Sequence, residues 1–193
     1  MSRTYRNSQE LLNVSGEFVM RNPDQIKKYL ESSKHLDKPI EFIYFDNDHE
    51  YDTLKDIIIK IHKDNPNHNI LVLARTNAII KRCFDTDYFN DELGTKISFV
   101  GYEDIDLEGM TIHKSKGLTF DEVIVIGLNK SFPSSDKEIY WITSLFRYPT
   151  INERIPYAEE RRLFYVALTR TKNHVYLLCD KNLKKDSDFI SEI

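Results

Sequence analysis

Residues 122 to 128 read Glu-Val-Ile-Val-Ile-Gly-Leu, and this nearly unbroken apolar run restricts the fold more than any other part of the chain. A run that is apolar on both faces is typical of a central strand in a parallel sheet covered by helices on both sides. Residues 70 to 74, Ile-Leu-Val-Leu-Ala, form a second such run. Both runs fall far short of the ~20 residues that a membrane helix needs, so we expect a soluble protein without a membrane partner.

Amphipathic segments alternate with these strands. Asn7 and Glu10 have the spacing of a capping box, and apolar side chains at helical spacing then predict a helix over residues 8–21. A second apolar stripe runs from Tyr51 to Ile61. Further strands are expected at residues 40–45, 96–102, 109–112 and 174–179, and further helices around residues 76–83 and over 159–170. This alternation predicts an α/β fold with a mostly parallel sheet and helices on both faces.

Composition narrows the class of protein further. The chain has 193 residues and a net charge of -4, which argues against coating nucleic acid by bulk charge but allows a local basic site. Cys83 and Cys179 lack the spacing of metal ligands, so we expect no metal site and a reducing, cytoplasmic compartment. Residues 130–158 have no clean period, and we expect them to form an excursion on the surface.

Two segments carry side chains suited to binding an anion. Tyr5 and Arg6 stand directly before the first predicted helix, although taken alone this segment is more simply explained by a packed tyrosine and a solvated arginine, since surface arginines are common. Residues 111–121 form a basic turn with two lysines and Gly117, whose amides and ammonium groups suit phosphate oxygens. A solvated turn is the alternative. The turn is not a Walker A loop, because the string GxxxxGK followed by Ser or Thr occurs nowhere in the chain.

A third segment places an arginine on an apolar stripe. In the helix predicted over 159–170, Arg170 continues the face formed by Leu163 and Val166. An arginine on the buried side of a helix needs an anion as partner. The residues leave two sources open, a carboxylate of the same fold or a phosphate supplied from outside.

These three segments together resemble a known family. Residues 111–128 read Thr-Ile-His-Lys-Ser-Lys-Gly-Leu-Thr-Phe-Asp-Glu-Val-Ile-Val-Ile-Gly-Leu, and residues 159–171 read Glu-Glu-Arg-Arg-Leu-Phe-Tyr-Val-Ala-Leu-Thr-Arg-Thr. In order and spacing they resemble motifs V and VI of the UvrD/Rep group of superfamily 1 helicases. Residues 4–8 are similar to motif IV. The resemblance implies that residues 1–193 form a single RecA-like domain of the P-loop NTPase type, the second of the two in such helicases.

The resemblance also implies roles at a nucleotide site. Arg6 and Arg170 would act as arginine fingers on ATP, which the missing N-terminal domain would hold with Mg²⁺ through its Walker A loop. Tyr5 would stack on the adenine, and Gly117 and Thr119 would contact the nucleotide. The family commonly has Glu at the position of Thr119. The isolated chain should then not hydrolyse ATP.

On the nucleic-acid side, the resemblance implies contacts with the backbone of single-stranded DNA. The residues concerned are His113, Lys114, Ser115 and Lys116. We therefore expect the C-terminal motor domain of an ATP-dependent 3′-5′ DNA helicase, and because motif IV lies so close to Met1, a fragment or split half. The alternatives are a stand-alone module that binds nucleic acid or protein without catalysis, and the helicase part of a nuclease complex.

Overall fold

A computed structural model describes residues 2–23, 25–26, 29–46, 49–84, 89–91, 95–99, 101–129, 132–133, 157–182 and 187–193. The strands are β1 (Ser2–Thr4), β2 (Leu30–Ser32), β3 (Ile40–Phe45), β4 (Ile70–Ala74), β5 (Phe89–Asp91), β6 (Lys96–Phe99), β7 (Leu107–Thr111), β8 (Glu122–Leu128) and β9 (Val175–Asp180). The helices are α1 (Gln9–Met20), α2 (Glu50–Asp64), α3 (Asn77–Phe84), α5 (Ala158–Leu168) and the 3-10 helix η1 (Asp188–Glu192).

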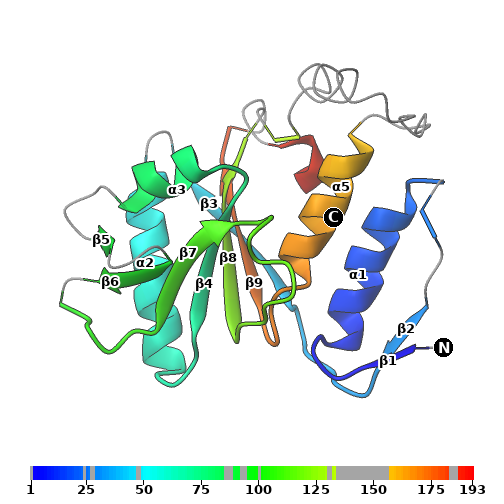
Figure 1. Cartoon of the computed structure of the whole chain (residues 1–193), viewed down its shortest axis with the longest axis horizontal. Helices are drawn as coiled ribbons and strands as arrows, with labels where there is room; N and C mark the ends of the chain where they lie inside the picture. Colours follow the sequence, from blue (N-terminus) through cyan, green and yellow to red (C-terminus); the bar gives the residue numbers. More distant parts are fainter. Residues whose placement is uncertain are drawn as a thin grey trace.

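A seven-stranded sheet in the order β3-β9-β8-β4-β7-β6-β5 forms the centre of the fold (Figure 1). The five strands from β3 to β7 in this order run parallel, and β6 and β5 add an antiparallel edge. β1 and β2 pair in a separate two-stranded parallel sheet. The prediction of a mostly parallel α/β sheet is therefore confirmed. β1, β2 and β5 were not predicted, because three residues are too few to establish a period.

Helices cover both faces of the sheet, as predicted. Along β4, Leu71 and Leu73 belong to a core that includes α1 and α5, whereas Val72 and Ala74 belong to a core that includes α2 and α3. Figure 1 shows α1 and α5 together on one side of the sheet and α2 on the other. The buried residues of α1 include Phe18, whose ring meets those of Phe164 and Phe189. Both ends of the chain therefore contribute to one core.

The predicted capping box at the start of α1 is wrong. Ser8 is the N-cap residue, and its Oγ accepts a hydrogen bond from the Leu11 backbone N–H at 3.3 Å. Glu10 instead accepts from the Leu36 backbone N–H at 2.9 Å and pairs with His35, which together lower the pKa of Glu10 to about 2. The side chain of Asn7 points away from the helix toward residues near the end of α5.

Two predicted segments end differently from expectation. α5 ends at Leu168, so Arg170 lies in the turn beyond the helix and not on its apolar stripe. Thr169 closes the helix, and its hydroxyl donates to the Tyr165 carbonyl at 2.9 Å. The surface excursion expected over residues 130–158 lies outside the described residues except at 132–133 and 157–158. Of these, Phe132 is buried against Phe164, contrary to a surface position.

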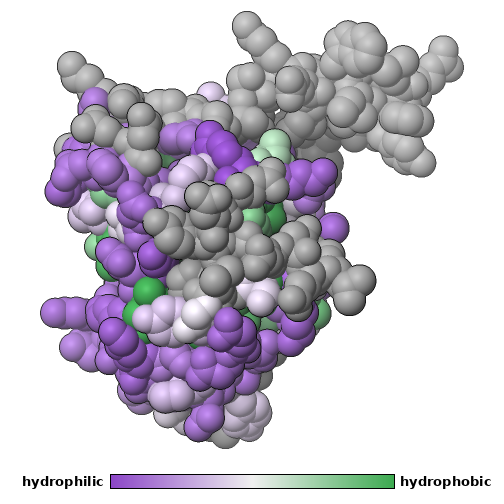
Figure 2. All heavy atoms as spheres, turned by 90° about the vertical axis from the view of Figure 1, so that its left-hand side faces the viewer, coloured by the Kyte–Doolittle hydropathy of each residue, from purple (hydrophilic) through white to green (hydrophobic). Residues whose placement is uncertain are grey.

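The described part of the chain offers little apolar surface at the β5–β6 edge. Figure 2 shows that this face is mainly hydrophilic where described residues form it. No described helix combines the length and the apolar character that a bilayer span requires. Cys83 and Cys179 are both buried.

Candidate functional site

Three segments that are far apart in the sequence meet at the end of α5. The Asn7 side-chain Nδ2 donates to the backbone carbonyls of Thr169 at 3.3 Å and Thr171 at 2.7 Å. The Phe120 backbone N–H donates to the Arg170 carbonyl at 3.0 Å, and Phe120 and Thr171 form a parallel bridge. The segments that resemble motifs IV, V and VI therefore share one hydrogen-bonded junction.

Among the described residues, the hydrogen-bond acceptors around Arg170 at this junction are all neutral. Its Nε donates to the Val166 carbonyl at 3.0 Å, and its Nη1 donates to the Leu118 carbonyl at 3.2 Å. Burial lowers the pKa of Arg170, and the nearby positive charge of Arg6 lowers that pKa further. Within the described ranges, no carboxylate forms an ion pair with Arg6 or Arg170. The carboxylate partner that the sequence left open is thus not found there, and the two cations favour an anion from outside.

The other residues predicted to bind the nucleotide are sequence neighbours of residues at this junction. Tyr5 precedes Arg6 and is 77% exposed. Gly117 and Thr119 flank Leu118, whose carbonyl accepts from Arg170. Gly117 has a φ of +92°, in the left-handed region that other residues rarely adopt. The fold therefore brings Arg6 and Arg170 to one junction, and Gly117 and Thr119 border this junction through Leu118.

The basic turn after β7 presents three of its four predicted DNA-binding residues to solvent. His113, Lys114 and Lys116 are exposed. Ser115 is fully buried, and its hydroxyl donates to the Ile112 carbonyl at 2.7 Å, so this side chain stabilises the turn from inside. Partial burial lowers the pKa of His113, and the charges of Arg75 and Lys116 lower it further. The lowered pKa favours the neutral form of the His113 imidazole.

An ion pair that sequence reasoning missed holds the other end of α5. Arg75 follows β4 directly, and its Nε and Nη2 donate to the Glu160 carboxylate at 2.6 to 2.9 Å. Glu160 is 1% exposed, and its hydrogen bond raises the pKa of Arg75. The sequence signal that could have identified Arg75 was its position. Arg75 stands at the carboxyl end of a buried strand, where ligands collect in α/β sheets.

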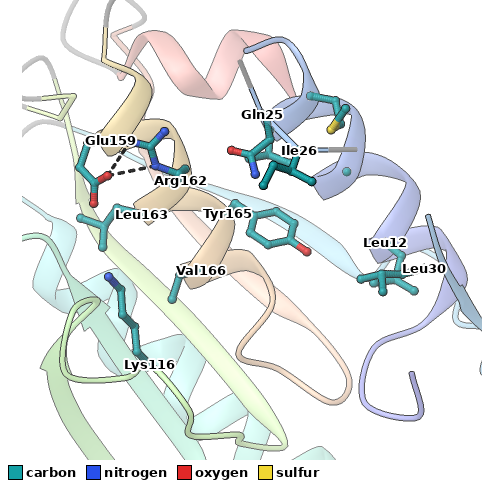
Figure 3. A pocket seen from close by; sticks show the side chains of 13 residues that line it. Leu12, Gln25, Ile26, Leu30, Lys116, Glu159, Arg162, Leu163, Tyr165 and Val166 are labelled. Carbon is teal, nitrogen blue, oxygen red and sulfur yellow. Dashed lines mark hydrogen bonds and ion pairs between the residues drawn. The ribbon is translucent and has the colours of Figure 1, made fainter. Parts of the chain in front are cut away.

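A groove of about 670 Å³ lies between α1 and α5 and reaches the basic turn (Figure 3). Its walls are mainly apolar, with contributions from Leu12, Gly16, Val19, Met20, Gln25, Ile26, Leu30, Lys116, Glu159, Arg162, Leu163, Tyr165 and Val166. In Figure 3 the Lys116 side chain extends toward Leu163 on α5. Glu159 and Arg162 pair with each other at 2.7 Å on the groove wall. The groove therefore connects the basic turn to the outer surface of α5.

The two carboxylates at the start of β8, those of Asp121 and Glu122, interact with basic side chains of the same fold. Burial acts to raise the pKa of Asp121, but the ion pair with Lys172 at 2.7 Å opposes it, and the pKa is lowered overall. Glu122 is 1% exposed and lies between His68 at 2.9 Å and His174 at 3.4 Å. Among the described residues, no cluster of three potential metal ligands is found. Both carboxylates therefore have roles in packing the amino ends of the strands.

Comparison with known proteins defines the class of this domain. Residues 91–182 match the family model of the UvrD-like helicase C-terminal domain, and over this segment the chain is similar to that family. The C-terminal domain of a possible DNA helicase from Lactobacillus plantarum WCFS1 has a TM-score of 0.58 at 14% sequence identity. That likeness covers 98% of this chain and 94% of the other, and it supports the RecA-like fold.

Individual relatives narrow the comparison. DNA helicase IV of Escherichia coli (strain K12) is 32% identical over 184 residues, covering 94% of this chain and 24% of that protein. An ATP-dependent helicase/nuclease subunit from Anoxybacillus flavithermus is 35% identical over 111 residues, covering 46% of this chain and 9% of that protein. The chain thus spans about a quarter of helicase IV and less than a tenth of the helicase/nuclease subunit.

Proposed function

We propose that this chain is the C-terminal motor half of an ATP-dependent 3′-5′ DNA helicase or translocase. The observation that carries the proposal is the junction of Arg6 and Arg170, two cations with no carboxylate partner in the described part of the chain. Such a pair suits a phosphate group that arrives from outside. DNA helicase IV is a DNA helicase by name, and the similarity to the UvrD-like family supports the same role.

On the nucleotide side, Arg6 and Arg170 contact the γ-phosphate of ATP as arginine fingers. The N-terminal RecA-like domain of the parent chain holds this ATP and its Mg²⁺ through a Walker A loop. A finger of this kind contributes about 10³ to 10⁵ in rate. Tyr5 stacks on the adenine, and Gly117 and Thr119 line the nucleotide. Because the Walker A string is missing, the isolated chain is inactive.

On the DNA side, the three exposed residues of the basic turn contact the phosphates of a single strand. These are His113, Lys114 and Lys116. Ser115 is buried, and its part is to keep the turn in shape. ATP binding draws the two RecA-like domains together and hydrolysis releases them, and this cycle moves the strand.

Residues 1–193 act as one RecA-like domain, and this domain functions in the cytoplasm. The packing of Phe18 against Phe164 and Phe189 supports a single unit, because it joins α1, α5 and η1 in one core. The free buried thiols of Cys83 and Cys179 agree with a reducing compartment.

One alternative function has specific support, and a second is disfavoured by the arginine pair. The similarity to a helicase/nuclease subunit favours a motor that feeds DNA to a nuclease. A stand-alone binding module would need only the basic turn and the groove, and it would have no use for a pair of unneutralised arginines at the junction.

The mass of the native protein in its source cells separates these functions, measured by mass spectrometry after capture with an antibody against this chain. A protein several hundred residues longer that contains a Walker A loop agrees with the helicase. A nuclease domain in the same protein favours the nuclease complex. A native protein of 193 residues alone contradicts the proposal in favour of the stand-alone module.

A further inference from the structure

We propose that Asn7 is a positioning residue that holds Arg6 and Arg170 together, so that both guanidinium groups meet the same phosphate. The inference rests on the proposed function, because it concerns the anion site formed by these two arginines. It adds a residue outside the assigned nucleotide and DNA contacts.

The hydrogen bonds of the Asn7 side chain act as a clamp, which here means that they connect the backbone beside Arg6 to the backbone on both sides of Arg170. One amide nitrogen, Nδ2, donates to the carbonyls of Thr169 and Thr171, the two neighbours of Arg170. The Arg170 carbonyl between them accepts from the Phe120 backbone N–H. Asn7 is 5% exposed, so these bonds are shielded from water. Because Asn7 is the next residue after Arg6, its side chain ties the backbone on both sides of Arg170 to the backbone that carries Arg6.

A clamp is needed because the two arginines repel each other. Both carry a positive charge, and the proximity of Arg6 destabilises the charged form of Arg170. Without an anion, this repulsion favours separation of the two segments, since neither arginine has a carboxylate partner in the described residues. The hydrogen bonds of Asn7 are neutral and hold the backbone, so they keep the pair in place while leaving both guanidinium groups free for a ligand.

The test uses inorganic tripolyphosphate as the probe and the full 193-residue chain as the protein. Its affinity is measured by isothermal titration calorimetry at low ionic strength, for the wild type and for Arg6→Ala, Arg170→Ala and Asn7→Ala. We expect each substitution to weaken binding by about tenfold, which corresponds to about 1.4 kcal/mol. Asn7→Leu, of similar volume but without donors, is expected to weaken binding equally and serves if Asn7→Ala fails to fold.

Two measurements separate positioning from a loss of stability. Asn22→Ala removes an equally buried asparagine beyond the opposite end of α1, and we expect unchanged affinity even where the melting temperature falls. In the Arg6→Ala background, Asn7→Ala should have little further effect, because no pair remains to be aligned. Full additivity, or an equal loss of affinity with Asn22→Ala, would overturn the clamp.

The outcomes also separate the clamp from the proposed function. If Arg6→Ala and Arg170→Ala weaken tripolyphosphate binding and Asn7→Ala does not, the clamp is wrong and the anion site stands. If neither arginine variant changes the affinity, the anion site itself is wrong, and the clamp fails with it.

Discussion

The ion pair between Arg75 and Glu160 allows a quantitative prediction, because the two partners differ in burial. Glu160 is 1% exposed, and the side chain of Arg75 is 23% exposed. Arg75→Ala therefore leaves a buried carboxylate without its guanidinium partner, which costs about 3 to 5 kcal/mol. Glu160→Gln keeps the size of the side chain and leaves an arginine that water reaches, so we expect a smaller loss of about 1 to 2 kcal/mol.

The assay is urea unfolding of the 193-residue chain followed by circular dichroism. With an m-value of about 2 kcal/mol/M, Arg75→Ala should lower the unfolding midpoint by about 1.5 to 2.5 M. The double variant Arg75→Met, Glu160→Leu should recover most of that loss, because apolar residues of similar volume replace a buried ion pair at little cost. As a control, Arg162→Ala breaks the exposed pair with Glu159, and a loss under about 1 kcal/mol is expected.

The reasoning is tested by which of the two single variants, Arg75→Ala or Glu160→Gln, loses more free energy of unfolding. If Glu160→Gln destabilises the chain more than Arg75→Ala, the reasoning from burial is refuted. A loss below about 1 kcal/mol for Arg75→Ala would show that this ion pair does not hold α5 against the sheet.

The remaining predictions concern DNA and pH. Changing Lys114 and Lys116 to Ala should weaken single-strand binding and reduce the slope of log affinity against log salt concentration by about 1.4, since each phosphate contact contributes about 0.7. Lys60→Ala with Lys63→Ala on α2 is the control. An unchanged slope for the first pair would show that the DNA does not contact this turn. The hydrogen bond to a buried carboxylate raises the pKa of His174 above 6.5, so its stabilisation is complete below that pH and is lost as the pH rises through the raised pKa. His174→Gln should remove this dependence from urea unfolding measured between about pH 6 and 9, and an identical pH profile in the variant would contradict the assignment.

The sheet could be predicted from the sequence because its central strands are continuous apolar runs. β4 and β8 are buried at every position, and their boundaries agree with those read from the sequence. β1 and β2 were missed because each has three residues and depends on its partner in a separate sheet. The end of α5 was misplaced because Thr169 closes the helix through its own hydroxyl, a local competition that periodicity does not reveal.

Individual residues of the candidate site could be predicted from the sequence, but the contacts that connect them could not. Arg6 and Arg170 were predicted from motif order, and the structure brings their segments together. The contacts of Asn7 with residues near 170 span more than 160 positions, and no local pattern encodes them. The resemblance implied that Ser115 contacts DNA, but its short hydroxyl side chain instead donates to a carbonyl within the turn.

The central claim is that Arg170 stabilises charge on ATP held by another domain, and single-strand-stimulated ATP turnover of the native protein tests it most directly. Arg170→Ala should lower turnover by a factor on the order of 10³ while circular dichroism shows an unchanged fold. Arg82→Ala on α3, an exposed arginine outside the site, should leave turnover unchanged. Near-normal turnover in the Arg170→Ala variant would contradict the account.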